Sequence, residues 1–409
     1  MLRRKEKDRD EIATRIGDSS VGIITYDTEH RIGPISTDYG ILFAVFSLMV
    51  IGSLMVFSAS VSLSDSPKYA TTETHFFIRH MISLAAALIC GYVCWHIPMK
   101  VWRRCAPVLF CLGVLLLIAV FVPGVGRKIN GASRWIPLGI LNLQVTEVMK
   151  IAVLLYAADF TVRKINYMHS IKKGFLPLLL VMVLVGFLVL KEPDLGAYFM
   201  MLAISMGILF LGGISIWIFF SILIGGFVLI ATMIMAASWR AARFFAYLDP
   251  WEISNAQGKA YQLSHSLIAF GRGEAFGVGL GDAIEKQHYL PEAHTDFILA
   301  IIGEELGFVG VVVILCLFFW IVRRAIEIGR QAIHLEHFFS GLVAQGIAIW
   351  FGIQTFINVG VASGLLPTKG LTLPFVSFGG SALLSCTAAV AILLRVDYEN
   401  KVTMQGGKI

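Results

Sequence analysis

Residues 39–61 read Tyr-Gly-Ile-Leu-Phe-Ala-Val-Phe-Ser-Leu-Met-Val-Ile-Gly-Ser-Leu-Met-Val-Phe-Ser-Ala-Ser-Val, and the run contains no charged residue. A helix of about 20 such residues crosses the ~30 Å hydrocarbon core of a bilayer. A helix is the expected form, because its backbone groups hydrogen-bond to one another where no water is available. The stretch therefore predicts a transmembrane helix.

Segments of the same kind recur along the whole chain, which is 57% hydrophobic and only 15% charged. Soluble proteins carry about 25% charged residues. These features predict an all-α polytopic membrane protein with about ten transmembrane helices. Only Gly212-Gly213 separates two of the segments, so one long broken helix and nine spans are the alternative. The ten segments are 39–61, 77–97, 105–122, 145–162, 174–190, 196–212, 214–238, 296–322, 340–362 and 373–395.

The distribution of Lys and Arg predicts the orientation, because these residues collect in cytoplasmic loops. It favours two cytoplasmic termini: a tail over 1–38, one membrane domain over 39–396 and a tail over 397–409. A large periplasmic loop, 239–294, lies between the seventh and eighth helices. The net charge of +6 has the same origin, so nucleic acid is not expected as a partner. The residues expected inside are Arg3, Arg4, Lys5, Lys7, Arg9, Lys100, Arg103, Arg104, Arg163, Lys164, Lys172, Lys173, Arg323, Arg324 and Arg330.

The large loop carries charges of both signs, and long connections of this kind tend to be functional. Its semi-apolar stretch 261–270 is expected to form a short helix lying in the membrane interface. The glycine-rich stretch 271–281 lacks the ending of a phosphate-binding loop and follows no strand, so it is interpreted as a flexible hinge.

Charged residues inside apolar segments are costly and therefore informative, at roughly 2.5–3.5 kcal/mol each at mid-membrane. Glu304 and Glu305 lie about 12 Å into the eighth helix at ~1.5 Å per residue. They either form a polar clasp between helices or contact a polar lipid headgroup or an ion. Glu147 and Lys150 are three residues apart on the fourth helix. They either pair with each other or direct Lys150 toward a phosphate.

Asp296 begins the eighth helix at the end of the large loop. A lone Asp at a helix start is commonly an N-terminal capping residue. At the membrane boundary, partial desolvation would instead raise its pKa toward that of a general base. Arg134 stands beside Trp135 in a short external loop. It is either an interfacial anchor or a bidentate ligand for a diphosphate.

Several stretches, in order along nearly the whole chain, resemble the SEDS family (shape, elongation, division and sporulation), most closely its FtsW branch. The form Leu-Pro-Thr-Lys-Gly-Leu-Thr-Leu-Pro over 366–374 is similar to division-type members. One departure is Gln-Val-Thr-Glu over 144–147, where the family commonly has Gln-Pro-Ser-Glu, which leaves the start of the fourth helix open. The matching stretches are Asn-Gly-Ala-Ser-Arg-Trp-Ile (130–136), Lys-Glu-Pro-Asp-Leu-Gly (191–196), Tyr-Leu-Pro-Glu-Ala-His-Thr-Asp-Phe (289–297), Ile-Gly-Glu-Glu-Leu-Gly (302–307), Asn-Val-Gly (358–360) and 364–381.

The resemblance implies a peptidoglycan glycosyltransferase that polymerises lipid II, the disaccharide-peptide carried on undecaprenyl diphosphate, during septal wall synthesis. The family's catalytic Asp matches Asp296. On this interpretation Arg134 and Lys150 offset the charge of the leaving diphosphate, and Glu147, the possible partner of Lys150, belongs to the same substrate site. The pair Glu304 and Glu305, together with Ser377 and Ser381, line the substrate cavity.

The resemblance also implies the setting of the activity. The expected location is the bacterial inner membrane at the division septum. The expected partners are the class B penicillin-binding protein FtsI and other division proteins, such as FtsQ, FtsL, FtsB and FtsN. No resident metal is predicted and no cofactor is required by the sequence, although Mg²⁺ or Mn²⁺ is an open option. Two rival hypotheses are a transporter that flips lipid II and a scaffold for division proteins.

Overall fold

The computed structural model describes residues 37–62, 74–129, 132–137, 139, 142–235, 238–367 and 370–407. The predicted N-terminal tail up to residue 36, Asn130-Gly131 and Lys369 lie outside these ranges. The elements in chain order are α2 (Tyr39–Ser60), α3 (His75–His96), α4 (Met99–Ala119), β1 (Arg127–Ile129), β2 (Ala132–Pro137), β3 (Asn142–Gln144), α5 (Val145–Arg163), η2 (Ile165–Tyr167), η3 (Ile171–Phe175), α6 (Leu176–Lys191), α7 (Leu195–Leu211), α8 (Ile216–Met235), α9 (Ser238–Leu248), α10 (Ile253–Ala256), α11 (Tyr261–Gly273), α12 (Ile298–His334), α13 (Phe338–Ala362) and α14 (Gly380–Met404).

The chain is an all-α multi-pass membrane protein, as predicted. Each predicted apolar segment falls on one long helix, α2 to α8 and α12 to α14. The last helix begins only at Gly380, because residues 373–379 form a loop around Pro374. By length and composition, seven described helices are able to cross a bilayer, so the total of ten spans stays a prediction. These seven are α2, α3, α4, η3 with α6, α12, α13 and α14.

The glycine pair between the sixth and seventh predicted segments separates two helices. Helix α7 ends at Leu211 and α8 begins at Ile216. Gly213 adopts φ +89°, a left-handed conformation that glycine reaches without a steric cost. The structure thus has two helices here instead of one continuous helix, and the number of spans stays a prediction.

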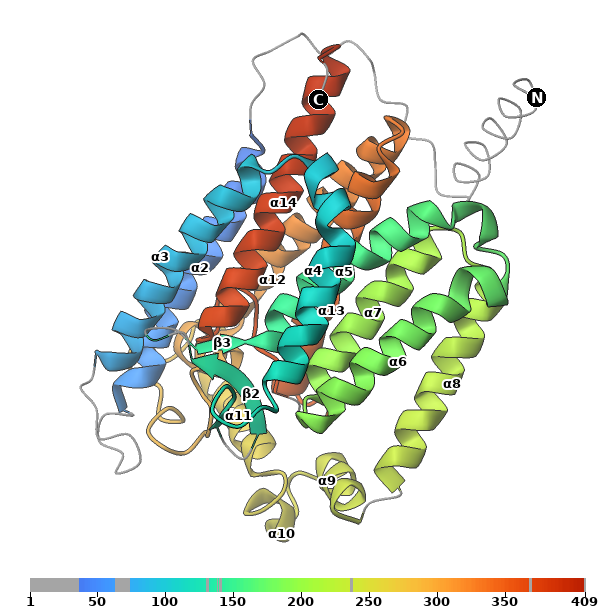
Figure 1. Cartoon of the computed structure of the whole chain (residues 1–409). Helices are drawn as coiled ribbons and strands as arrows, with labels where there is room; N and C mark the ends of the chain where they lie inside the picture. The colour runs from blue at the N-terminus through green and yellow to red at the C-terminus, as the bar shows by residue number, and fades with distance from the viewer. Residues whose placement is uncertain are drawn as a thin grey trace, which may run out of the picture. The chain divides into compact units, whose positions relative to one another are not determined.

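Contacts between distant segments define two ends of the helical body (Figure 1). At one end, where the C-terminus lies, three interactions join helix ends: Arg324 with Asp38 at 2.6 Å, Arg103 with Asp159 at 3.3 Å, and the Met99 amide with Glu399 at 2.9 Å. The small sheet, α9 to α11 and the start of α12 gather at the opposite end. The predicted cytoplasmic cations Lys100, Arg103, Arg163 and Arg324 thus share the end away from the large loop.

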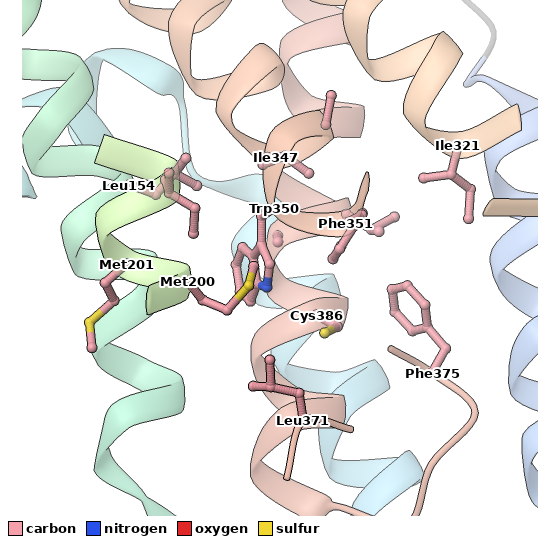
Figure 2. Packing of buried hydrophobic residues seen from close by; sticks show 14 of the residues in the cluster. Leu154, Met200, Met201, Ile321, Ile347, Trp350, Phe351, Leu371, Phe375 and Cys386 are labelled. Atoms are coloured by element: carbon pink, nitrogen blue, oxygen red, sulfur yellow. The ribbon is translucent and has the colours of Figure 1, made fainter. Parts of the chain in front are cut away.

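Helices α13 and α14 form the centre of the packing. In the most apolar part of each helix, 67% of the residues of α13 and 78% of those of α14 are buried. The value is 22% for α3 and for α4, whose apolar side chains face outward. Figure 2 shows Trp350 of α13 facing Met200 of α7. The ring centroid of the next residue, Phe351, lies 5.5 Å from the ring centroid of Phe375. The loop after α13 is therefore packed into the core rather than spread over the surface.

Helix α12 is interrupted at Gly307, whose φ of +67° and ψ of −166° are not helical. The loop segment 274–279 supplies the missing backbone partners. The amides of Val278 and Gly279 donate to the carbonyls of Glu304 and Glu305, at 2.9 and 3.1 Å. The amides of Phe308 and Val309 donate to the carbonyls of residues 274 and 275, at 3.0 and 3.1 Å. The stretch predicted as a flexible hinge is instead held against the break in α12.

The stretch expected to lie in the membrane interface is a helix, α11, but one of its faces is packed inside the protein. Leu263, Ser266 and Ala269 are buried, and the Ser266 hydroxyl donates to the Ala362 carbonyl at 2.7 Å. Gly273 approaches the backbone of Gly303 so closely that a methyl group at that position would collide. Helix α11 therefore fixes the start of α12 and, with it, the residues that precede α12.

Candidate functional site

Asp296 lies just before α12, with its side chain partly exposed. The Asn358 side-chain amide of α13 donates to two main-chain carbonyls, that of Asp296 at 3.0 Å and that of Leu371 at 2.7 Å. Gly370 faces the carboxylate so closely that an added Cβ would lie 3.0 Å from Oδ2. One buried amide thus fixes the Asp296 backbone and the loop opposite it.

The turn before Asp296 is built by Glu292, which has a φ of +56°. Its carbonyl accepts from the amides of Thr295 and Phe297, at 3.1 and 3.2 Å. The Thr295 hydroxyl donates to the Glu292 carboxylate at 2.9 Å. His294 is buried, with its ring centroid 5.2 Å from that of Phe76 and 5.7 Å from that of Phe378. These contacts leave Asp296 as the carboxylate of this turn that faces the 370 loop.

The surroundings of Asp296 raise its pKa from an ordinary 3.8 to about 7. Burial is the largest cause, because it disfavours the charged form. The carboxylates of Glu292 and Asp194 add to the rise, and Arg134 opposes it. At neutral pH the group is divided between its two protonation states, which suits a side chain that takes up a proton during a reaction.

Arg134 lies on β2, the central strand of the antiparallel sheet β1-β2-β3. Its Nε donates to the carbonyl of Glu192 and its Nη2 to that of Pro193, both at 2.7 Å. Nη1 lies 3.9 Å from Asp194 Oδ2. The guanidinium is thus bound mainly by neutral acceptors, and the Arg134 side chain remains 29% exposed.

Two acidic residues of the α6–α7 turn, Glu192 and Asp194, were missed as site residues in the sequence reasoning. Asp194 caps α7 through a 3.1 Å hydrogen bond from the Ala197 amide. Its other oxygen accepts from Gln144 at 3.4 Å and from Thr146 at 3.3 Å. The signal that would have found them is the matching stretch 191–196, which holds two carboxylates within three positions.

Lys150 and Glu147 pair with each other, at 2.9 Å between Nζ and Oε1. Lys150 is 1% exposed, lies 4.9 Å from the Trp350 ring centroid and donates to Gln354 at 3.3 Å. The Gln354 amide in turn donates to the Thr372 carbonyl at 2.8 Å. The pair is therefore linked to the 370 loop through Gln354. Helix α5 begins at Val145, so the departure from the expected Gln-Pro-Ser-Glu form still leaves a helix start at this position.

The two serines hold the loop that faces Asp296. The Ser377 hydroxyl accepts from the Leu373 amide at 2.8 Å. The Ser381 hydroxyl accepts from the Gln144 amide at 2.8 Å and donates to the Asn142 carbonyl at 2.9 Å. Both side chains are buried. In the structure they shape the loop and join it to β3, and their predicted contact with substrate stays a prediction.

Glu304 and Glu305 are occupied by contacts that fasten the large loop. Glu304 accepts from the amides of Ile284 and Glu285, at 2.9 and 3.2 Å, and lies 3.6 Å from Arg272. Glu305 accepts from Lys286 and from Ser58 of α2, both at 2.6 Å. Of the two interpretations, the structure has the polar clasp, and it does not bring this pair into contact with Asp296. Contact with a headgroup stays a prediction.

In the described part of the chain, no three His, Cys, Asp or Glu side chains converge as ligands for a metal ion. The charged groups around Asp296 are instead two carboxyl groups and one guanidinium. A partly protonated carboxylate beside a cation is suited to removing a proton from a substrate that carries negative charge.

Comparison with known proteins adds to this geometry. Residues 39–402 match the model of a family described as cell cycle proteins, which spans FtsW, RodA and SpoVE. A relative from Polynucleobacter necessarius subsp. necessarius, named "Probable peptidoglycan glycosyltransferase FtsW", is 56% identical over 373 residues, 91% of this chain and 88% of its own.

Two solved structures have a similar fold. One belongs to a study of how a peptidoglycan synthase complex coordinates polymerization and crosslinking, with a TM-score of 0.70 and 25% identity. The other is the rod shape determining protein RodA of Thermus thermophilus, with a TM-score of 0.63 and 25% identity. Each match covers 89% of this chain and 98% of the other. The similarity of fold therefore extends over most of both chains.

Proposed function

The chain belongs to the FtsW/RodA/SpoVE family of cell cycle proteins, and on that basis we propose that it polymerises lipid II with Asp296 as the general base. It is a peptidoglycan glycosyltransferase embedded in the membrane by several helices. The observation that carries the assignment of the base is the environment of Asp296. Burial raises the pKa of its carboxyl group to about 7, and the group stands opposite a packed loop and near Arg134.

The reaction moves one proton and breaks one bond to the leaving group. A sugar hydroxyl of the acceptor attacks the anomeric carbon of the donor, and its proton passes to the Asp296 carboxylate. The bond between that carbon and the diphosphate oxygen breaks, and its electron pair leaves with the lipid diphosphate. Arg134 offsets the charge that grows on the diphosphate, an electrostatic contribution to transition-state stabilisation.

Lys150 and Glu147 contribute to the same site through Gln354. The Lys150–Gln354–Thr372 chain of hydrogen bonds supports the loop that faces Asp296. In the structure Lys150 already has Glu147 as its partner, so its contact with the diphosphate requires the substrate to replace that carboxylate. Arg134 is the cation whose side chain is already open to a ligand.

The assay that tests polymerisation uses the purified protein with labelled lipid II, and glycan length is read on a gel. Strands that lengthen with time are expected. A protein that moves lipid II across vesicle membranes without making strands would favour the transporter hypothesis. Repeating the assay with a chelator, followed by addition of Mg²⁺ or Mn²⁺, measures whether a divalent cation contributes.

The setting proposed for this activity is the septal inner membrane, with both termini in the cytoplasm. The partner proposed is the class B penicillin-binding protein FtsI, with FtsQ, FtsL, FtsB and FtsN as further members of the assembly. The similar fold in a peptidoglycan synthase complex supports a transpeptidase partner. We expect FtsI to be recovered with the chain after crosslinking in native membranes. Its absence from such a pull-down, when the chain itself is recovered, would contradict this pairing.

A further inference from the structure

Glu192 is fully buried in the turn between α6 and α7, and neither of its carboxyl oxygens has a hydrogen-bond partner among the described residues. A buried charge without a partner is expensive, since the interior does not replace its hydration. The neutral acid is much less costly to bury. The position of Glu192 beside the proposed site makes its protonation state relevant to the charge of that site.

Among the described residues, the charges of Asp194 and Arg134 act on the Glu192 carboxyl group. Asp194 belongs to the same turn, and Arg134 comes from β2. The Glu192 main chain is itself a ligand of the guanidinium, because its carbonyl accepts from Arg134 Nε at 2.7 Å. The neighbouring Lys191 is directed elsewhere, with its Nζ 4.4 Å from the Phe187 ring centroid. The side chain of Glu192 and the proposed diphosphate are therefore potential competitors for one cation.

We propose that Glu192 is a positioning residue, which as a neutral acid leaves the charge of Arg134 available to an anionic substrate and as a carboxylate competes for it. This inference rests on the proposed function, in which Arg134 faces the diphosphate of lipid II. We assign this role to Glu192 and not to Asp194, because the Asp194 carboxylate already accepts hydrogen bonds from Ala197, Gln144 and Thr146.

The direction of the pH effect follows from the surroundings of Glu192. Burial and the charge of Asp194 raise the pKa of Glu192 to about 8, while Arg134 acts in the opposite direction. Below that pH, Glu192 is neutral, and Asp194 and Arg134 balance each other. Above it, the three groups together carry a negative charge, which repels a diphosphate and draws Arg134 toward the turn.

The first test compares polymerisation between pH 6 and 9.5 in the wild type, Glu192→Gln, Glu192→Asp and the control Asp249→Asn, which alters an exposed carboxylate of the large loop. Wild type, Glu192→Asp and the control are expected to lose activity roughly five- to tenfold from pH 7.5 to pH 9, as one group titrates near pH 8. Glu192→Gln, which mimics the neutral acid, is expected to keep its activity at pH 9. A purely structural role would leave the two pH profiles alike.

The second test measures binding of labelled undecaprenyl diphosphate at pH 7 and pH 9 without turnover. Binding by the wild type is expected to weaken at pH 9 by a similar factor, while binding by Glu192→Gln is expected to stay constant. Equal weakening in both proteins, or none in the wild type, overturns the role of Glu192. If Glu192→Gln does not fold, Glu192→Ala, which also lacks the carboxyl group, takes its place in the comparison with the wild type. If no protein polymerises lipid II at any pH, the proposed function fails, and the binding data judge Glu192 separately.

Discussion

At the level of single residues, a small number of groups determines the pKa of Asp296. Burial raises its pKa, Glu292 and Asp194 raise it further, and Arg134 lowers it. A base with a pKa of about 7 is both available at neutral pH and strong enough to accept a proton. An Asp with its ordinary pKa of 3.8 would be ionised but much weaker as a base.

The first prediction concerns Asp296→Asn. The amide keeps the size of the side chain but cannot take the proton, so a loss of about 10²- to 10⁴-fold in polymerisation is expected. In the wild type, activity is expected to rise with pH through about 7, because the carboxylate is the active form. Lipid II binding and glycan synthesis are measured on the same preparations. Full synthesis by the variant would remove Asp296 from the mechanism.

The same substitution makes a prediction about stability. When the pKa of a carboxyl group is raised in the folded state, the folded protein loses stability as the pH rises through that pKa. Asp296→Asn cannot ionise, so above pH 7 it is expected to unfold at a temperature equal to or higher than that of the wild type. Thermal unfolding in detergent at pH 6 and pH 8 checks this. A variant that unfolds earlier at pH 8 would show that its lost activity reflects a damaged fold.

Arg134 is the second residue with a predicted effect. Its planar guanidinium donates to two carbonyls and still reaches a ligand, a geometry that the Lys ammonium does not reproduce. Arg134→Ala and Arg134→Lys are both expected to reduce polymerisation at least tenfold, with Lys retaining the larger share. Activity within twofold of the wild type in Arg134→Ala would identify this residue as an interfacial anchor only.

At the level of elements, the start of α12 is fastened by the clasp between Glu305, Lys286 and Ser58. Removing one member of a buried ion pair typically costs 3–5 kcal/mol, because the remaining charge is left unpaired. Lys286→Met is therefore expected to lower the unfolding temperature clearly, and Lys286→Met with Glu305→Gln is expected to recover most of the loss. Thermal unfolding of the two single variants and the double variant measures the coupling. Additive effects would show that the pair does not hold the loop.

Elements also show how far a sequence alone leads. The ten apolar segments and the position of Asp296 followed from hydropathy and from the loop that precedes it. Glu192, Gln354 and Asn358 did not, because each acts through contacts with segments far away in the chain. The positive φ of Gly307 likewise emerged only with the segment 274–279 that pairs there. Local spacing identifies charged residues, but it does not identify their partners.

For the whole molecule, the collection of Lys and Arg at the end away from the large loop predicts the orientation in the membrane. Gln257 in the large loop and Lys172 between η2 and α6 are both exposed. A Gln257→Cys variant is expected to react with a membrane-impermeant maleimide in intact spheroplasts, whereas Lys172→Cys reacts only after permeabilisation. The reverse pattern would invert the orientation. The native cysteines are replaced first in both variants.

The break at Gly307 has a mechanical consequence. A continuous helix carries a tilt from one end to the other, but one without an unbroken hydrogen-bond ladder bends at the gap. We therefore expect a partner that displaces the long C-terminal part of α12, 308–334, to transmit little of that motion to Asp296. Helix α13 is continuous over Phe338–Ala362, and the side-chain amide of its Asn358 donates a hydrogen bond to the Asp296 carbonyl. We therefore expect a displacement of the Phe338 end of α13 to reach the Asp296 backbone more directly than a displacement of 308–334.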